Sequence, residues 1–122
     1  DESHDGRHLF NSHGVISVTS NLSPALMRQL MDKQDDVLNK QLIPLMNWLF
    51  CEPNPIAINT ALAMTSAANP VFRLPYLPLT LEQRDAGFAL MSDINSSDLV
   101  GTTLNVMSDD DFIRRFPPVI GH

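Results

Sequence analysis

The chain has 122 residues, enough for one ordinary domain, and its 43% content of hydrophobic residues is that of a globular protein. Eight Lys and Arg residues against 14 Asp and Glu residues give a net charge of −6, which repels phosphate backbones and disfavours nucleic acid as a partner. The longest apolar run, residues 42–51, contains Pro44 and Asn47 and is far shorter than the ~20 residues that span a bilayer, so no membrane partner is expected.

The first part of the sequence predicts a short helix and then a strand. Residues 5–10 favour a brief helix, and the Asn-Ser-His-Gly cluster ends it because Gly14 suits a left-handed cap. Residues 15–19 are dense in β-branched side chains and lead into a polar turn at Asn21. That composition is typical of a strand, and this is the only strand that the sequence predicts.

Two amphipathic helices are predicted next. Ser23 is the expected cap of the first, over about residues 24–33, and Asp35 or Asp36 is the expected cap of the second. Pro44 lies inside the second helix and is expected to bend it or to divide it. The residues at helical spacing that we expect to face the core are Leu26, Met27, Leu30 and Met31 in the first helix, and Leu38, Leu42, Leu45, Met46 and Leu49 in the second.

Two further helices are predicted, each with its own start signal. Asn54 is the expected cap of a helix over about residues 55–66, with a proline at its first position. Thr80 and Gln83 form a capping box for a helix over about residues 81–94. The expected inner faces are Ile58, Ala61, Leu62 and Thr65 in the third helix, and Leu81, Phe88 and Met91 in the fourth.

The sequence after Asn95 loses this periodic pattern. It is polar, and its acidic triplet at residues 109–111 lacks the alternating oxygen ligands and the glycine turn of a calcium loop. We therefore expect residues 96–122 to form a loosely structured, solvated tail.

The predicted strand has no partner within the sequence. A single strand cannot satisfy its own backbone N–H and C=O groups, and no second strand-like run is present to pair with it. We therefore expect the partner strands to come from outside this chain. A nearly continuous apolar strand between helices is typical of one βα step of a parallel α/β sheet or barrel.

Several side chains are candidates for chemistry, and each has a simpler structural explanation that we favour. His4 and His8 are one helical turn apart, but a zinc site needs three or four ligands, so a solvated helix face is expected. Cys51 lies at the end of a helix and is expected to be a small buried thiol. Lys33 and Lys40 have polar and acidic neighbours, which solvate a lysine and do not activate it as a Schiff-base nucleophile.

A proline-rich stretch at residues 70–78 connects the third helix to the fourth. Its Pro-Tyr-Leu-Pro core has the form of a polyproline ligand, but Arg73 is out of the register that such ligands use. We expect an extended connector packed over the helices. Its expected core residues are Val71, Phe72, Leu74 and Leu77.

Three segments of the chain carry a family resemblance. Residues 14–21 (GVISVTSN), 49–56 (LFCEPNPI) and 72–79 (FRLPYLPL) resemble, in order and approximate separation, the C-terminal portion of the dihydrodipicolinate synthase family. The opening, residues 1–5, resembles the stretch after the seventh barrel strand of that family. Residues 109–113 resemble the ending of its plant-type members. The similarity therefore covers most of the chain.

The resemblance implies an α/β fold, namely the last βα unit of a (β/α)8 TIM barrel followed by a C-terminal helical domain. Residues 1–34 would be the end of the barrel, with helix 7, strand 8 and helix 8. Residues 35–95 would be the C-terminal helical domain, and residues 96–122 the loosely structured tail. This chain by itself would be mostly α-helical with one strand.

The resemblance also implies an activity. Members of the family hold pyruvate as a Schiff base on a lysine and condense it with aspartate semialdehyde in lysine (diaminopimelate) biosynthesis. Ile16 matches the position whose backbone carbonyl lines the pyruvate pocket, and it is the one substrate-binding residue that we predict. The Schiff-base lysine and the other catalytic residues of the family have no counterpart here, so the chain alone is expected to be inactive. We predict no cofactor and no metal.

The resemblance implies a homotetramer for the complete enzyme and, through the plant-type ending, a location in the chloroplast; a cytoplasmic location is the alternative. Cys51 is the single cysteine, so an internal disulfide is excluded and a reducing compartment is indicated. The sequence begins at Asp1 without a signal-peptide pattern, so we expect a processed chain or a part of a longer one.

Two other functions stay open from the sequence. One is a non-catalytic helical interaction module derived from the family, which a monomer with a cooperative unfolding transition would favour. The other is part of a sister aldolase with the same lysine chemistry, such as an N-acetylneuraminate lyase. Residues 52–55 and 72–75 favour the synthase over the lyase.

Overall fold

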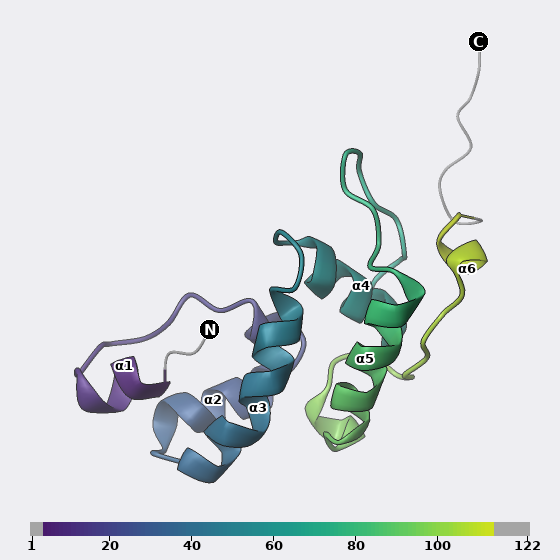
Figure 1. The fold of residues 1–122 in the computed structure, drawn as a ribbon. Helices are drawn as coiled ribbons and strands as arrows, with labels where there is room; N and C mark the ends of the chain where they lie inside the picture. The colour runs from purple at the N-terminus through teal and green to yellow at the C-terminus, as the bar shows by residue number, and fades with distance from the viewer. Residues whose placement is uncertain (1–3, 114–122) are drawn as a thin grey trace.

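The structure, a computed structural model, describes residues 4–113, and its regular elements are all helical in that range. Figure 1 shows α1 on one side of the molecule, α4 and α5 on the other, and α2 and α3 between them. The elements are α1 (His4–Leu9), the 3-10 turn η1 (Thr19–Asn21), α2 (Pro24–Asp32), α3 (Asp36–Leu49), α4 (Ile56–Met64), α5 (Leu81–Ser92), the 3-10 turn η2 (Ser96–Asp98) and α6 (Asp109–Ile113).

The strand predicted over residues 15–19 is wrong for this chain. Residues 14–18 have no regular structure, Thr19 begins η1, and no strand occurs within residues 4–113. A strand needs a neighbour that donates and accepts the ladder hydrogen bonds, and this part of the chain offers none. The β-branched residues Val15 and Val18 instead pack against the edge of the helical core.

The first two helices lie where the sequence predicts them, and Ser23 is the N-cap residue of the second, as predicted. α1 covers His4–Leu9, and α2 begins at Pro24. The side chain of Ser23 makes no capping hydrogen bond; its Oγ donates instead to the carbonyl oxygen of Asp98 at 2.5 Å. Ser23 is fully buried, and its hydrogen bond to Asp98 joins two segments that are distant in sequence.

α3 is one continuous helix with Pro44 inside it, so of the two outcomes predicted at Pro44 the division into two helices is wrong. Pro44 lies on the exposed side of the helix, where water can bind the carbonyl that loses its N–H partner. Asp35 is the cap, and its side chain accepts a hydrogen bond from the amide of Leu38 at 3.0 Å. That bond and a second one from Gln29 hold the pKa of Asp35 below its ordinary value.

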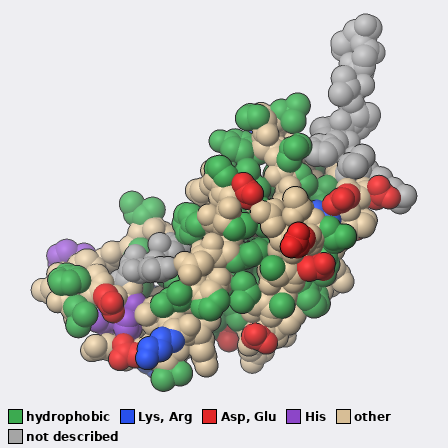
Figure 2. All heavy atoms as spheres, in the orientation of Figure 1, with side chains coloured by type: hydrophobic (Ala, Val, Ile, Leu, Met, Phe, Trp, Pro, Cys, Tyr) green, Lys and Arg blue, Asp and Glu red, His purple; other side chains and the backbone are tan. Residues whose placement is uncertain are grey.

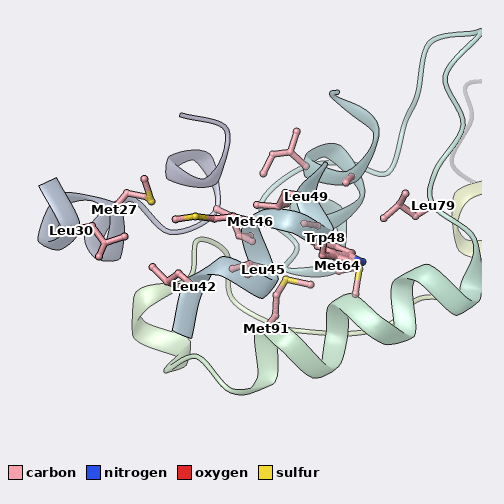
Figure 3. Packing of buried hydrophobic residues seen from close by; sticks show 14 residues of the cluster. Met27, Leu30, Leu42, Leu45, Met46, Trp48, Leu49, Met64, Leu79 and Met91 are labelled. Carbon is pink, nitrogen blue, oxygen red and sulfur yellow. The ribbon is translucent and has the colours of Figure 1, made fainter. Parts of the chain in front are cut away.

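The hydrophobic core is centred on α3. Figure 3 shows its apolar side chains between those of α2 on one side and those of α4 and α5 on the other. The predicted inner face of α3 is confirmed, with Leu38 only partly buried and Trp48 as an additional core residue. Buried members of this core are Met27 and Leu30 of α2, Leu42, Leu45, Met46, Trp48 and Leu49 of α3, Ala57, Ile58, Ala61 and Met64 of α4, and Met91 of α5.

α4 is buried over more of its surface than the sequence predicts, because α3, α5 and the C-terminal segment all pack on it. It begins at Ile56, and Pro55 is its cap residue without a side-chain hydrogen bond. The predicted cap, Asn54, is exposed, so that prediction is wrong. Thr60 is fully buried; its hydroxyl donates to the carbonyl of Ile56 at 2.9 Å and accepts from the amide of Leu79 at 3.1 Å.

Thr60→Val is expected to lower the free energy of unfolding by about 1–3 kcal/mol, because the buried amide of Leu79 loses its acceptor while the side chain keeps its shape. Thr60→Ser keeps the hydroxyl and is the matched control, with a smaller loss. Urea unfolding followed by circular dichroism measures both. If the two variants were equally stable, the hydroxyl would contribute nothing to the fold.

α5 begins at the predicted capping box, which is confirmed. The Thr80 side chain accepts from the amide of Gln83, and the Gln83 side chain accepts from the amide of Thr80. The predicted inner face is partly wrong, since Leu81 is exposed while Arg84 and Gly87 are buried. α3 approaches so closely at Gly87 that a Cβ there would lie 2.0 Å from Cζ2 of Trp48.

The connection from α4 to α5 projects from the body of the molecule in Figure 1 instead of packing over the helices. Phe72 is buried as predicted, but the predicted core residues Val71, Leu74 and Leu77 are exposed, and so is Tyr76. Figure 2 shows hydrophobic side chains gathered at the tip of this projection.

The segment after α5 is ordered, so the prediction of a loose tail from residue 96 is wrong for its described part. It forms η2 and α6, and Phe112 is buried. The acidic triplet is not wholly free in solvent either, because Asp109 pairs with the buried Arg84. Residues 114–122 of the predicted tail lie outside the described residues. Within residues 4–113, no helix is long and apolar enough to cross a bilayer.

Candidate functional site

The one predicted substrate-binding residue, Ile16, lies in a segment that we call the Ile16 segment, residues 14–23. Its second half is a tight turn: the amide of Ser20 donates to Oγ of Ser17 at 3.0 Å, and the Ser20 hydroxyl donates back to the Ser17 carbonyl at 3.0 Å. The amides of Leu22 and Ser23 both donate to the carbonyl of Thr19, at 3.0 and 2.9 Å. These bonds make residues 17–23 a compact unit.

The side chain of Ile16 is fully exposed, at 100% of its surface. Thr19, three residues later, is fully buried, and Val15 and Val18 are partly buried against the core. The segment therefore has one side on the helical core and one open side. A second chain segment paired edge to edge with residues 14–18 would supply the ladder hydrogen bonds that a strand needs.

A concavity of about 480 Å³ lies beside the Ile16 segment and is also lined by α2. Its polar lining includes Arg7, His13 and Arg28. The guanidinium of Arg7 donates to the carbonyl of Ser12 at 2.8 Å, and that of Arg28 pairs with Asp32 at 2.7 Å. Both cations are thus already engaged by groups of the chain.

The nucleophilic side chains give no activated group at this place. Lys33 and Lys40 are exposed, which confirms that both are solvated. Cys51 is exposed, so the prediction of a buried thiol is wrong. Desolvation by the surrounding chain, with the charge of Glu52 as a smaller cause, raises the pKa of the Cys51 thiol and keeps it a poor nucleophile.

The two histidines of α1 are not on a solvated helix face, so that prediction is wrong. His4 is only 2% exposed, and its ring nitrogens lie 3.5 Å from Asp5 and 3.8 Å from Asp36. His8 is half-buried, with Nε2 2.7 Å from the carbonyl of Leu30. No group of three or more metal-ligating side chains comes together in the described part of the chain.

Sequence reasoning missed Arg84, a buried charged residue of α5. It is 1% exposed, and its guanidinium donates to the carbonyl oxygens of Leu79 and Met107 and to a carboxylate oxygen of Asp109. A signal for it existed: position 84 falls on the same helix face as the predicted inner residues Phe88 and Met91. A charged residue on an apolar face indicates a buried partner.

Comparison with known proteins decides the family. The sequence profile described as the Dihydrodipicolinate synthetase family matches residues 1–94. The chain belongs to this family. The dihydrodipicolinate synthetase profile includes the Ile16 segment and α1 to α5, and it ends before η2.

Relatives and one solved structure agree with this assignment. The chloroplastic 4-hydroxy-tetrahydrodipicolinate synthase of Coix lacryma-jobi is 53% identical over 115 residues, which cover 93% of this chain and 30% of that protein. The chloroplastic synthase 1 of Arabidopsis thaliana is 52% identical over 93% of this chain and 32% of its own length. The synthase of Herminiimonas arsenicoxydans is 37% identical over 70% of this chain.

A crystal structure of a dihydrodipicolinate synthase superposes on this chain with a TM-score of 0.60 at 28% identity. The superposition covers 68% of this chain and 31% of that one. The chain therefore spans about a third of the length of the family members that it matches.

Proposed function

We propose that this chain is the C-terminal part of a 4-hydroxy-tetrahydrodipicolinate synthase subunit. The observation that carries the proposal is the 53% identity to a synthase of that name over 93% of this chain. The matched region makes up 30% of the relative's length. In the complete subunit, residues 1–34 would close the barrel and residues 35–95 would form the C-terminal helical domain. The Ile16 segment would become the eighth strand once its neighbours supply the ladder that the isolated segment lacks.

The proposed chemistry is the condensation of pyruvate with aspartate semialdehyde in lysine biosynthesis. Pyruvate would be held as a Schiff base on a lysine outside this chain, because Lys33 and Lys40 are both exposed to solvent and a Schiff-base lysine needs a desolvating or cationic surrounding. This chain would contribute the backbone carbonyl of Ile16 to the pyruvate pocket. The place of Ile16 within residues 14–21, one of the three segments that carry the family resemblance, supports that role. By the same resemblance we propose a chloroplast location and a homotetramer.

A chimeric subunit tests the function. Residues 1–122 of this chain replace the matching residues of the Arabidopsis thaliana relative, and condensation is followed by the consumption of aspartate semialdehyde in the presence of pyruvate. We expect condensation at a rate within about tenfold of the parent enzyme, since most of the replaced region packs away from the reacting atoms. The same chimera without the Schiff-base lysine of the parent part is the control. A soluble, folded chimera with no condensation above that control would contradict the proposal.

The 122-residue chain alone is expected to form no imine with pyruvate. Borohydride reduces an imine to a stable adduct, so treatment with pyruvate and borohydride should leave the mass of the chain unchanged, because neither lysine is activated. The parent enzyme, labelled under the same conditions, is the positive control. Stoichiometric labelling of Lys33 or Lys40 would show that a lysine described here as solvated is reactive.

A further inference from the structure

The C-terminal segment, residues 96–112, begins by binding the end of the Ile16 segment. The hydroxyl of Ser23 donates to the carbonyl of Asp98 at 2.5 Å, and the amide of Val100 donates to the carbonyl of Leu22 at 2.9 Å. Leu22 and Ser23 are fully buried, at 0% exposure. Each bond therefore satisfies a polar group that water does not reach.

The segment then crosses the end of α4 at very close range. The amides of Thr102 and Asn105 donate to the carbonyl oxygens of Thr65 and Met64, at 3.0 and 2.9 Å. Gly101 has a φ of +89°, and a Cβ at this residue would lie 2.0 Å from the Thr65 carbonyl oxygen. Only glycine fits both the backbone conformation and the distance, so this crossing depends on the residue at 101.

The far end of the segment is anchored on Arg84. Its Nε donates to the carbonyl of Met107 at 3.1 Å, and its Nη2 donates to Asp109 at 2.6 Å. Phe112 is 1% exposed, with its ring 5.0 Å below the Arg84 guanidinium and 6.0 Å from the ring of Phe72. Figure 1 shows the segment in yellow-green as it passes along α5 to α6.

This segment lies beyond the residues that the family profile matches. The family profile ends at residue 94, and the Herminiimonas relative matches 70% of the chain, whereas the plant relatives match 93%. The contacts above thus join residues outside the profile match to residues within it. Because residues 96–112 bind buried main-chain groups of residues 22 and 65, they help to hold those groups in place.

We propose that residues 96–112 are a brace that positions the Ile16 segment, with Ser23 and Arg84 as the positioning residues at its two ends. The path is short: Asp98 holds Ser23, Ser23 is bonded through its amide to the carbonyl of Thr19, and Thr19 is three residues from Ile16. The effect of the brace on pyruvate binding rests on the proposed function. The effect of the brace on the mobility of the Ile16 segment does not.

Amide hydrogen exchange of the 122-residue chain tests the mobility. Ser23→Ala removes only the bond to Asp98, because the Ser23 side chain does not cap α2. We expect amides of residues 17–23 to exchange about tenfold faster, with α4 unchanged. Ser97→Ala, at an exposed position of η2, is the matched control with no change. A chain that ends at Asn95 should show the same acceleration more strongly.

Unchanged exchange of residues 17–23 in Ser23→Ala would overturn the brace, whether or not the shortened chain folds. The chimeric subunit then separates the catalytic consequence: Ser23→Ala should raise KM for pyruvate about threefold to tenfold, with kcat changed less. An inactive parent chimera would count against the proposed function and leave the exchange result standing. Faster exchange with an unchanged KM would show that the brace does not act on pyruvate binding.

Discussion

Gly87→Ala is expected to lower the free energy of unfolding by about 3 kcal/mol or more, because the interface between α3 and α5 has no room for one methyl group. The new Cβ would lie 2.0, 2.3 and 2.6 Å from three atoms of the Trp48 indole. The indole has little room to move aside, since it is 7% exposed and its Nε1 donates to the carbonyl of Gln83 at 2.8 Å. The two helices must therefore separate.

Thermal and urea unfolding followed by circular dichroism measure this loss. Gly14→Ala is the matched control, because a Cβ at Gly14 meets no atom within 4 Å. Trp48→Phe removes the outer part of the indole, with Cζ2 and Cη2 that the new methyl group would strike, so the double variant should be more stable than the sum of the two single losses predicts. A Gly87→Ala chain as stable as Gly14→Ala would mean that α3 and α5 are not in contact there.

Arg84→Met is the second large effect that we expect, a loss of about 3 kcal/mol, because methionine fills the space but donates no hydrogen bonds. The carbonyl oxygens of Leu79 and Met107 would lose their donors, and Phe112 would lose the guanidinium above its ring. Asp109 itself suffers less, because its side chain is 71% exposed and stays hydrated. Most of the expected loss in the free energy of unfolding therefore comes from the two backbone carbonyl oxygens that are left without donors.

Arg28→Met is the control for Arg84→Met. Arg28 also pairs with an aspartate, Asp32, but its side chain is 79% exposed, so the expected loss is below about 1 kcal/mol. Urea midpoints of the two variants give the comparison, and hydrogen exchange locates the effect. Arg84→Met should accelerate exchange in residues 105–112 more than elsewhere. Equal midpoints for the two variants would refute the anchoring role of Arg84.

The sequence predicted those parts of the fold that are controlled by near neighbours. Pro24, the Asp35 cap and the Thr80–Gln83 capping box each act within one helical turn, and all three helix starts are found where they were predicted. The inner face of α3 follows from spacing alone. Failures occurred where the outcome depends on distant groups: the strand lacks partners, and the connection at Leu74 projects instead of packing.

The candidate site was predictable only in part, for the same reason. Ile16 comes from a family resemblance, and its role in the pyruvate pocket stays a prediction that the chimera would test. The brace was not foreseen, because residues 96–112 carry no periodic pattern and several of their bonds to the rest of the chain are made by main-chain groups. A backbone carbonyl such as that of Asp98 has no signature in the sequence, and its partner Ser23 is 75 positions away. Arg84 alone gave a readable signal.

The indole of Trp48 gives this protein an intrinsic optical probe of one contact. Trp48 is the single tryptophan among the 122 residues, and its ring lies between α3 and Gly87 of α5 with little access to water. Its fluorescence in the folded chain should lie at short wavelength and resist collisional quenching by acrylamide. When α3 and α5 move apart, water reaches the ring and the emission shifts to the red, whereas circular dichroism reports the loss of the helices. The order of those two changes would show whether the helical core opens at this interface first.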